Sequence, residues 1–116
     1  MAKLQITDNN DHQVVVELND SQAAKDLIAQ QPSTVKLSNY AGDEKMFYPE
    51  QELSTAATPH ADAKVDTLGY YAPWGDVCLF YRNFGRDSGL YELGTTVSGQ
   101  DQITKLTGMA KLTVLA

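Results

Sequence analysis

Apolar and polar side chains alternate in several short segments of this chain, and such alternation predicts β-strands with one buried face. Residues 4–6 and 14–18 alternate in this way, and residues 8–11 between them are the turn formers Asp-Asn-Asn-Asp. We therefore expect a β-hairpin at the start of the chain. The same alternation predicts further strands at residues 35–38, 46–48, 90–97 and 112–114.

Two short helices are expected between the strands. An Asn-Asp-Ser segment offers side chains that cap a helix, and Asn19 with Gln22 resembles a capping box. Pro32 ends this first helix, because proline cannot donate a hydrogen bond to the preceding turn. The second helix begins near Ser98, which we expect to cap it, and Gly108 fits its left-handed end.

The bulkiest apolar stretch lies at residues 69–85 and reads GYYAPWGDVCLFYRNFG. A rigid corner at 73–75 precedes strand-forming residues at 77–81, which predicts two strands joined by this corner, with the aromatic ridge inside the fold. By contrast, residues 50–66 show no pattern and predict a long loop, and residues 86–89 predict a turn. So few helices cannot cover both faces of an open sheet. The pattern therefore predicts a mainly β fold, a closed eight-stranded β-barrel with two short helices.

Length and charge narrow the class of protein. The 116 residues predict a single domain spanning 1–116. Acidic side chains number 15 against 9 basic ones, and the net charge of −6 argues against nucleic acid and anionic membranes as partners. The chain has no apolar run near the ~20 residues that a membrane-spanning helix needs. Its start lacks the apolar core of a secretory signal, so we expect a cytoplasmic protein.

The residue types that carry most catalytic and metal chemistry are few in this sequence. Cys78 is the single cysteine and lies in an apolar run, which favours a buried, unreactive thiol. His12 and His60 have no partners at metal-ligand spacing, so no metal site is predicted, and no glycine-rich phosphate loop indicates a cofactor. Arg82 has two open interpretations, a clamp for an anionic ligand or a surface ion pair.

Several segments carry a more specific signal than the strand pattern. They are residues 19–27, 39–45 (NYAGDEK), 70–75 (YYAPWG), 80–81 (FY), 88–90 (SGL) and 93–94 (LG). Together they resemble bacterial cyclophilin-like domains, the small relatives of cyclophilin. The resemblance covers nearly the whole chain, and YYAPWG followed by FY is its most specific part. It implies an eight-stranded barrel with helices closing its ends.

Cyclophilins proper are peptidyl-prolyl isomerases, and the resemblance bears on that activity. Their catalytic arginine lies in a Phe-His-Arg segment followed by Gln-Gly-Gly-Asp, which should fall between the first helix and the aromatic stretch. This chain has no arginine before Arg82, and Lys36 and Lys45 lack the planar fork of arginine. Isomerisation needs a cation or a strong donor beside the proline nitrogen, so we expect no catalytic residue here.

We therefore expect a non-catalytic barrel that binds a small molecule or a peptide segment in an aromatic groove. By resemblance, the corner at 71–75 borders the groove in which cyclophilins bind substrate. Three alternatives stay open: rings that merely close the barrel, a weak peptidyl-prolyl isomerase, and an accessory partner of a flavodoxin-like redox protein, since related domains are fused to such modules. The candidate ligand-binding residues are Tyr40, Tyr48, Tyr71, Pro73, Trp74 and Arg82.

Overall fold

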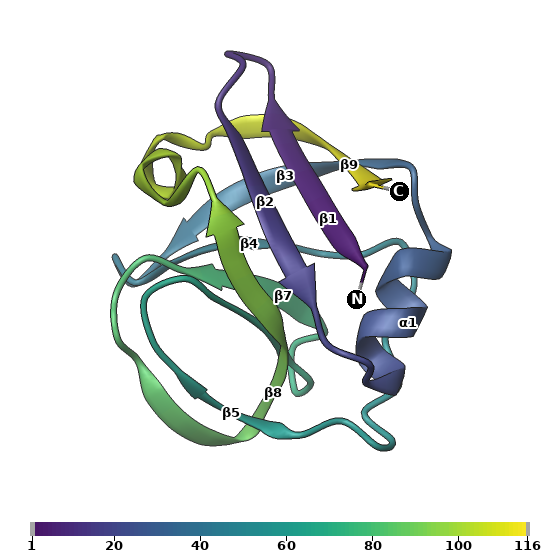
Figure 1. Ribbon diagram of the computed structural model, residues 1–116. Coiled ribbons are helices and arrows are strands. Elements are labelled where there is room, and N and C mark those ends of the chain that lie inside the picture. Colours follow the sequence, from purple (N-terminus) through teal and green to yellow (C-terminus); the bar gives the residue numbers. More distant parts are fainter. Residues whose placement is uncertain (1, 116) are drawn as a thin grey trace.

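The computed structural model describes residues 2–115, which contain nine strands and two short helices joined by turns and loops (Figure 1). The strands are β1 (Lys3–Asp8), β2 (Gln13–Leu18), β3 (Ser33–Tyr40), β4 (Glu44–Phe47), β5 (His60–Ala63), β6 (Thr67–Tyr71), β7 (Asp76–Phe80), β8 (Gly85–Ser98) and β9 (Gly108–Leu115). The helices are α1 (Gln22–Ala29) and the 3-10 helix η1 (Gln100–Lys105).

Eight of these strands close into an antiparallel barrel, which confirms the fold predicted from the sequence. Their order around the wall is β2-β1-β9-β3-β4-β7-β6-β8, and pairing of β8 with β2 closes the ring. All the pairings are antiparallel. Closure leaves no free edge in the wall, so two short helices suffice to cover the core.

The barrel interior holds the main hydrophobic core, to which every strand of the wall contributes. Helix α1 adds Ala23, Ala24 and Leu27 to this core, and η1 adds Ile103. Each fully buried leucine or isoleucine stabilises the fold by roughly 1.5–3 kcal/mol relative to an exposed one. The wall residues of this core are Leu4, Ile6, Val14, Val16, Leu18, Val35, Leu37, Phe47, Leu68, Tyr70, Val77, Leu79, Leu93, Ala110 and Leu112.

A second, smaller core lies on the outer face of the wall. Strand β5 pairs with the first half of β8, and this ribbon bows out beyond the barrel at the lower left of Figure 1. Along β7, Val77 and Leu79 point into the barrel, whereas Cys78 and Phe80 point outward and pack with Leu90 of β8. Strand β7 is therefore buried on both faces.

This second core corrects three expectations. Residues 50–66 contain strand β5, so they are not one long loop, and residues 86–89 belong to β8 rather than to a turn. The aromatic ridge is divided between the two faces of the wall, with Tyr70 inside the barrel and Phe80 in the outer core. Successive side chains of a strand must point to opposite faces, so a continuous aromatic run cannot all face inward.

The start of helix α1 confirms the predicted cap segment but not the capping box. The N-cap is Ser21, whose Oγ accepts a hydrogen bond from the amide of Ala24 at 3.1 Å. Asn19 forms no capping box, because its side-chain amide donates instead to the carbonyl of Glu92 at 2.7 Å. Asn19 therefore fastens the entrance of the helix to strand β8.

The second helix is a short 3-10 helix, and its cap is Gly99 rather than Ser98. Gly99 has φ 77°, and a Cβ there would lie 2.2 Å from the carbonyl oxygen of Gln13, so only glycine fits. Gly108 has the predicted positive φ, 71°, but it begins β9 and does not end the helix, whose C-cap is Leu106.

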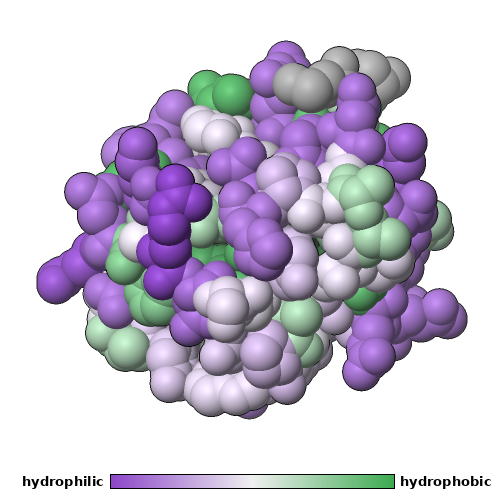
Figure 2. Space-filling model, turned by 90° about the horizontal axis from the view of Figure 1, so that it is seen from below, coloured by the Kyte–Doolittle hydropathy of each residue, from purple (hydrophilic) through white to green (hydrophobic). Residues whose placement is uncertain are grey.

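The face seen from below is mainly polar, and apolar side chains form small separate patches on it (Figure 2). Within residues 2–115, neither helix has the length and apolar character that crossing a membrane requires.

Candidate functional site

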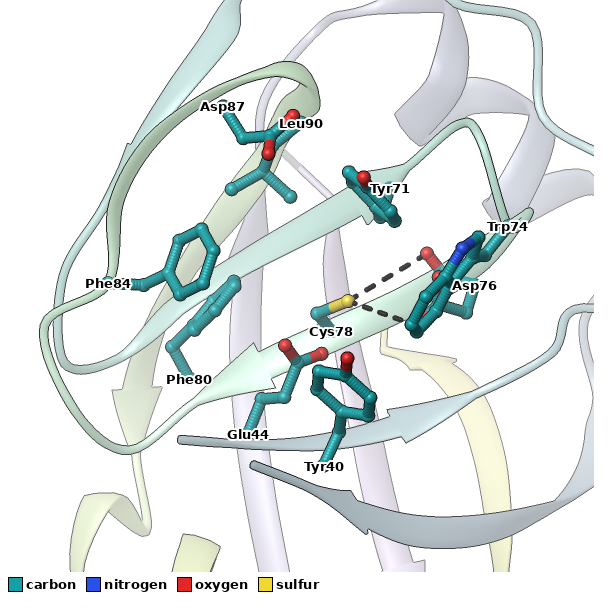
Figure 3. Close-up of a pocket in the computed structure, with 10 residues that line it drawn as sticks. All are labelled: Tyr40, Glu44, Tyr71, Trp74, Asp76, Cys78, Phe80, Phe84, Asp87 and Leu90. Atoms are coloured by element: carbon teal, nitrogen blue, oxygen red, sulfur yellow. Dashed lines mark hydrogen bonds between the residues drawn. The ribbon is translucent and has the colours of Figure 1, made fainter. Parts of the chain in front are cut away.

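A pocket of about 230 Å³ opens on the outer face of the wall, where β4, β6 and β7 face the first half of β8 (Figure 3). It lies beside the second core and is separated from the main core by the wall itself. Its walls are mostly aromatic, and its floor is polar. The residues that line it are Tyr40, Glu44, Tyr71, Trp74, Asp76, Cys78, Phe80, Phe84, Asp87 and Leu90.

Strand alternation and register bring the floor residues together. Asp76, Cys78 and Phe80 are alternate residues of β7 and share its outer face. Glu44 of the neighbouring strand β4 is directly opposite Phe80 in the antiparallel ladder. The carboxyl groups of Glu44 and Asp76 consequently approach the thiol of Cys78 from two different strands.

These three side chains form a compact polar cluster. Glu44 is 6% exposed, and Asp76 and Cys78 are each 2% exposed. The thiol of Cys78 donates a hydrogen bond to Oδ2 of Asp76 at 3.4 Å, and one ligand atom from each of the three residues lies within 4.8 Å of the others. The other carboxylate oxygen of Asp76, Oδ1, is buried and has no hydrogen-bond partner among residues 2–115. The cluster therefore presents unused acceptor capacity to the pocket.

Burial sets the protonation of the cluster. It raises the pKa of Glu44, and the neighbouring charges of Asp76 and Asp43 raise it further, while a hydrogen bond from Cys78 opposes the change. Burial likewise raises the pKa of Asp76, and burial with the two carboxylates raises the pKa of the Cys78 thiol. Ion pairs of the described chain involve other acids, Asp8 and Asp62. Nothing within 2–115 therefore neutralises these carboxylates by an ion pair.

Three aromatic rings surround the mouth of the pocket. The Trp74 ring meets Tyr40 edge-on, with centroids 5.1 Å apart and planes at 84°, and it meets Tyr71 in the same way at 5.6 Å and 81°. Trp74 is 50% exposed and Tyr40 is 43% exposed. The tight corner between β6 and β7 holds Trp74 there, since the amide of Gly75, at φ 70°, bonds to the carbonyl of Tyr71.

Figure 3 shows the floor cluster between two aromatic groups. Tyr40 and Trp74 lie on one side, and Phe80 and Phe84 lie on the other. The two phenylalanine rings are 5.4 Å apart and tilted by 38°. Phe80 is buried and Phe84 is exposed, so this pair extends from the floor to the mouth.

The structure brings together some of the residues predicted from the sequence. Those that line the pocket are Tyr40, Tyr71 and Trp74. Those that lie outside it and are exposed are Tyr48, Pro73 and Arg82. Pro73 instead packs against Gly89, where an added Cβ would lie 2.6 Å from the proline ring. Arg82 does not line this pocket, and within the described chain it makes no ion pair, so the surface ion pair considered for it is not formed.

Sequence reasoning missed the polar floor. Cys78 is buried as predicted, but Glu44 and Asp76 were not singled out. Each carboxylate lies at the first position of a strand whose remaining residues are buried, and this is the available signal. Their convergence depends on the pairing of β4 with β7, which no local pattern specifies.

The remaining basic and imidazole side chains lie elsewhere. His12 has a partner that the sequence did not predict: its Nδ1 lies 2.9 Å from Oδ2 of Asp8. His60 is exposed and stacks on Tyr91 at a centroid distance of 4.5 Å. Lys45 lies on the opposite face of β4 from Glu44, and its burial lowers its pKa. Its Nζ is 6.0 Å from the centre of the Tyr81 ring. Neither this lysine nor the exposed Lys36 lines the pocket.

The floor could hold a cation in either of two forms. Two carboxylates and a thiol are ligand types found around transition metals. A metal would require the thiol to lose its proton, which its raised pKa opposes. A cationic organic group would need only the carboxylates, and it would also contact the aromatic rings.

Fold and site together define a small closed β-barrel with an acidic, aromatic-rimmed pocket on its outer wall. The sequence profile of the Cyclophilin-like family matches residues 6–115, and this chain belongs to that family. The resemblance drawn from the YYAPWG segment is thereby confirmed. The chain is also similar to the solution structure of a hypothetical protein from Archaeoglobus fulgidus, with a TM-score of 0.68 and 16% sequence identity. That likeness covers 96% of this chain and 92% of the archaeal one, and it shows the fold alone. No curated protein matches this chain.

Proposed function

We propose that this barrel is a binding protein whose outer pocket takes a small molecule or one side chain of a peptide. The supporting observation is a concave, mostly aromatic cavity with a few convergent polar groups, which is the usual composition of a ligand site. Its volume of about 230 Å³ is below the roughly 300–1,000 Å³ of pockets for drug-sized ligands. A compact ligand, or a single side chain, therefore fits best.

The polar groups of the pocket favour binding over prolyl isomerisation. An isomerase stabilises the twisted amide by placing a cation or a strong donor beside the proline nitrogen. The charged side chains lining this pocket are the carboxyl groups of Glu44, Asp76 and Asp87. Carboxylates accept hydrogen bonds and cannot replace that donor.

The single tryptophan makes this proposal directly testable. Trp74 is the only tryptophan of the chain and lies at the mouth of the pocket, so its indole signal reports on this site alone. We expect a library of fragments with about ten non-hydrogen atoms to yield ligands that shift the Trp74 indole resonance in ¹H–¹⁵N NMR spectra.

Two variants identify the site of binding. Trp74→Ala should lower the affinity for the ligands found. Binding to this variant is measured through the resonances of the other aromatic residues. Tyr48→Ala is the matched control, because Tyr48 is an exposed aromatic residue outside the pocket, and it should leave binding unchanged. The proposal fails if no fragment moves the Trp74 signal, or if both variants weaken binding equally.

A further inference from the structure

The floor of the pocket contains a buried acceptor that the described chain does not use. Oδ1 of Asp76 is buried and unpaired within 2–115, and the Asp76 residue, which is 2% exposed, lines the cavity. Leaving a buried acceptor without a hydrogen bond costs free energy, because its hydration is lost without replacement. A donor on a ligand in the pocket would restore that bond.

The charges around the floor select the sign of the ligand. The titratable groups that face it are acidic or neutral, and they come from five strands and one turn. No lysine, arginine or histidine is among the residues that line the cavity. An anionic ligand would add to the repulsion between the carboxylates, whereas a cation would relieve it. These groups are Tyr40 of β3, Asp43 of the β3–β4 turn, Glu44 of β4, Tyr71 of β6, Asp76 and Cys78 of β7, and Asp87 of β8.

The walls above the floor suit an organic cation. Trp74 stands nearly perpendicular to both Tyr40 and Tyr71, so these rings form three sides of an open cage. Aromatic faces attract cations, and their apolar surface also covers an alkyl chain. A bare metal ion would contact the floor only and would leave the rings without a role.

We infer that the pocket recognises a protonated amine, whose N–H groups bond to Glu44 and Asp76 while its carbon chain lies between the Tyr40, Tyr71 and Trp74 rings. This inference rests on the proposed binding function and names the chemical class of its ligand. A quaternary ammonium ion fits less well, because it carries no N–H to donate to the Asp76 oxygen. The same ammonium group occurs on small free amines and on lysine side chains.

The decisive comparison sets a protonated amine against a neutral ligand of similar shape and against a cation that has no N–H group. We would titrate the full chain with n-butylamine, with neutral 1-butanol and with tetramethylammonium at about pH 8, where an alkylamine is protonated. Binding is followed by Trp74 fluorescence and by its indole NMR signal. We expect n-butylamine to bind at least about tenfold more tightly than either of the other two.

Variants of the floor then assign the effect to its carboxylates. Glu44→Gln and Asp76→Asn should each reduce the affinity for n-butylamine by about tenfold or more, while the weak binding of 1-butanol remains. Asp66→Asn is the matched control: Asp66 also has an unpartnered buried oxygen and a pKa raised by burial, but it lies outside the pocket. This control should bind n-butylamine as the unchanged chain does.

Proton linkage gives an independent readout. Burial raises the pKa of Glu44 and of Asp76, and an ammonium group bound beside them would lower both pKa values again, so binding should release protons over the pH range in which these carboxyls titrate. We expect the affinity for n-butylamine to increase from about pH 5 to about pH 8, and calorimetry in buffers of different ionisation enthalpy to record proton release. 1-Butanol carries no charge, so its binding should show no comparable dependence on pH.

Two further ligands separate the source of the amine. Nα-acetyl-lysine N-methylamide carries the same group on a peptide backbone, and tighter binding of this compound than of n-butylamine indicates a lysine side chain. The reverse order indicates a free amine. Either order supports recognition of an ammonium group.

The outcomes that overturn the inference are distinct from failure of the pocket. If 1-butanol binds as tightly as n-butylamine, the pocket is a ligand site but not an amine site. If Cd²⁺ produces a thiolate absorption band from Cys78 at one equivalent and n-butylamine does not bind, the floor is a metal site instead. If no compound moves the Trp74 signal, both the inference and the proposed function fail.

Discussion

The carboxylate of Asp8 links the β1–β2 turn to the segment before β9, and replacing it tests how much its hydrogen bonds contribute to stability. Its Oδ1 accepts hydrogen bonds from the amides of Asn10 and His12, both at 2.9 Å. Its Oδ2 lies 2.9 Å from Nδ1 of His12 and accepts from the amide of Thr107 at 3.1 Å. One buried side chain therefore fixes both the β1–β2 turn and the connection from η1 to β9.

Asp8→Ala removes all four of these bonds. Water can replace the acceptor for Asn10 and Thr107, which are exposed, so each bond is valued near its net contribution of about 1 kcal/mol, and the total loss at about 4 kcal/mol. Asp8→Asn keeps one oxygen and the two bonds to Oδ1, so it should lose about 2 kcal/mol. Asp20→Ala removes an exposed acid and should change stability by less than about 0.5 kcal/mol.

The pH dependence has a defined sign. Burial by itself would raise the pKa of Asp8, but the bonds from His12, Asn10 and Thr107 outweigh it and hold the pKa below the ordinary value of 3.8. A carboxyl with a lowered pKa stabilises the fold fully above its ordinary pKa and ceases to do so as the pH falls through its folded value. The difference between the unchanged chain and Asp8→Asn should therefore shrink below about pH 3.8.

Guanidinium chloride unfolding at pH 7 measures the stability differences, and thermal melts in acid follow their pH dependence. A loss below about 1 kcal/mol for Asp8→Ala would show that the four bonds contribute little beyond hydration. A difference between Asp8→Asn and the unchanged chain that stays constant through acid would show that Asp8 is not held ionised by its partners.

Three further predictions concern the site and the wall. Glu44→Gln should raise the free energy of unfolding at pH 8, because a carboxyl whose folded pKa is raised destabilises the fold as the pH increases, and denaturant titration near pH 4 should show no such gain. Gly94→Ala should lower the free energy of unfolding by about 3 kcal/mol in thermal melts, since its Cβ would lie 2.1 Å from the carbonyl oxygen of Glu17 where β2 pairs with β8. Gly42→Ala meets no neighbour and should lower it by only about 1 kcal/mol, through its positive φ. A protease-coupled assay with a proline peptide should record no rate above background, and acceleration would show that the pocket supplies a donor we have not identified.

The parts of the fold that local pattern specifies could be predicted. The β1–β2 hairpin follows from strict alternation around a polar turn, and the β6–β7 corner follows from proline and glycine between apolar runs. Strand β5 could not be predicted, because its four residues, His-Ala-Asp-Ala, have weak strand propensity and form a strand by pairing with β8. The glycine-rich first half of β8 indicated a turn for the same reason, since its strand conformation comes from its partners.

The pocket likewise combines residues that the local sequence predicts with residues that only strand pairing brings together. Trp74 and Tyr71 were predictable because large aromatic residues beside a rigid corner cannot all be buried in a small barrel. The acidic floor was not, because Glu44 and Asp76 are 32 positions apart in the sequence and meet only through the register of β4 on β7. Their burial also needs the second layer on the outer face, which sequence reasoning had assigned to a loop.

The floor is difficult to explain as a contribution to stability. Like-charged carboxyls in a dry site weaken the fold at neutral pH, and apolar residues of similar volume at these two positions would pack without that cost. The opposite arrangement is seen at Asp8, where a buried carboxylate has four donors and stabilises the structure. Asp76 differs because it lines the cavity and one of its buried oxygens has no donor in the described chain. A buried charge that the fold does not satisfy is accounted for when its partner arrives from outside, and the amine is the ligand that supplies both the charge and the missing hydrogen bond.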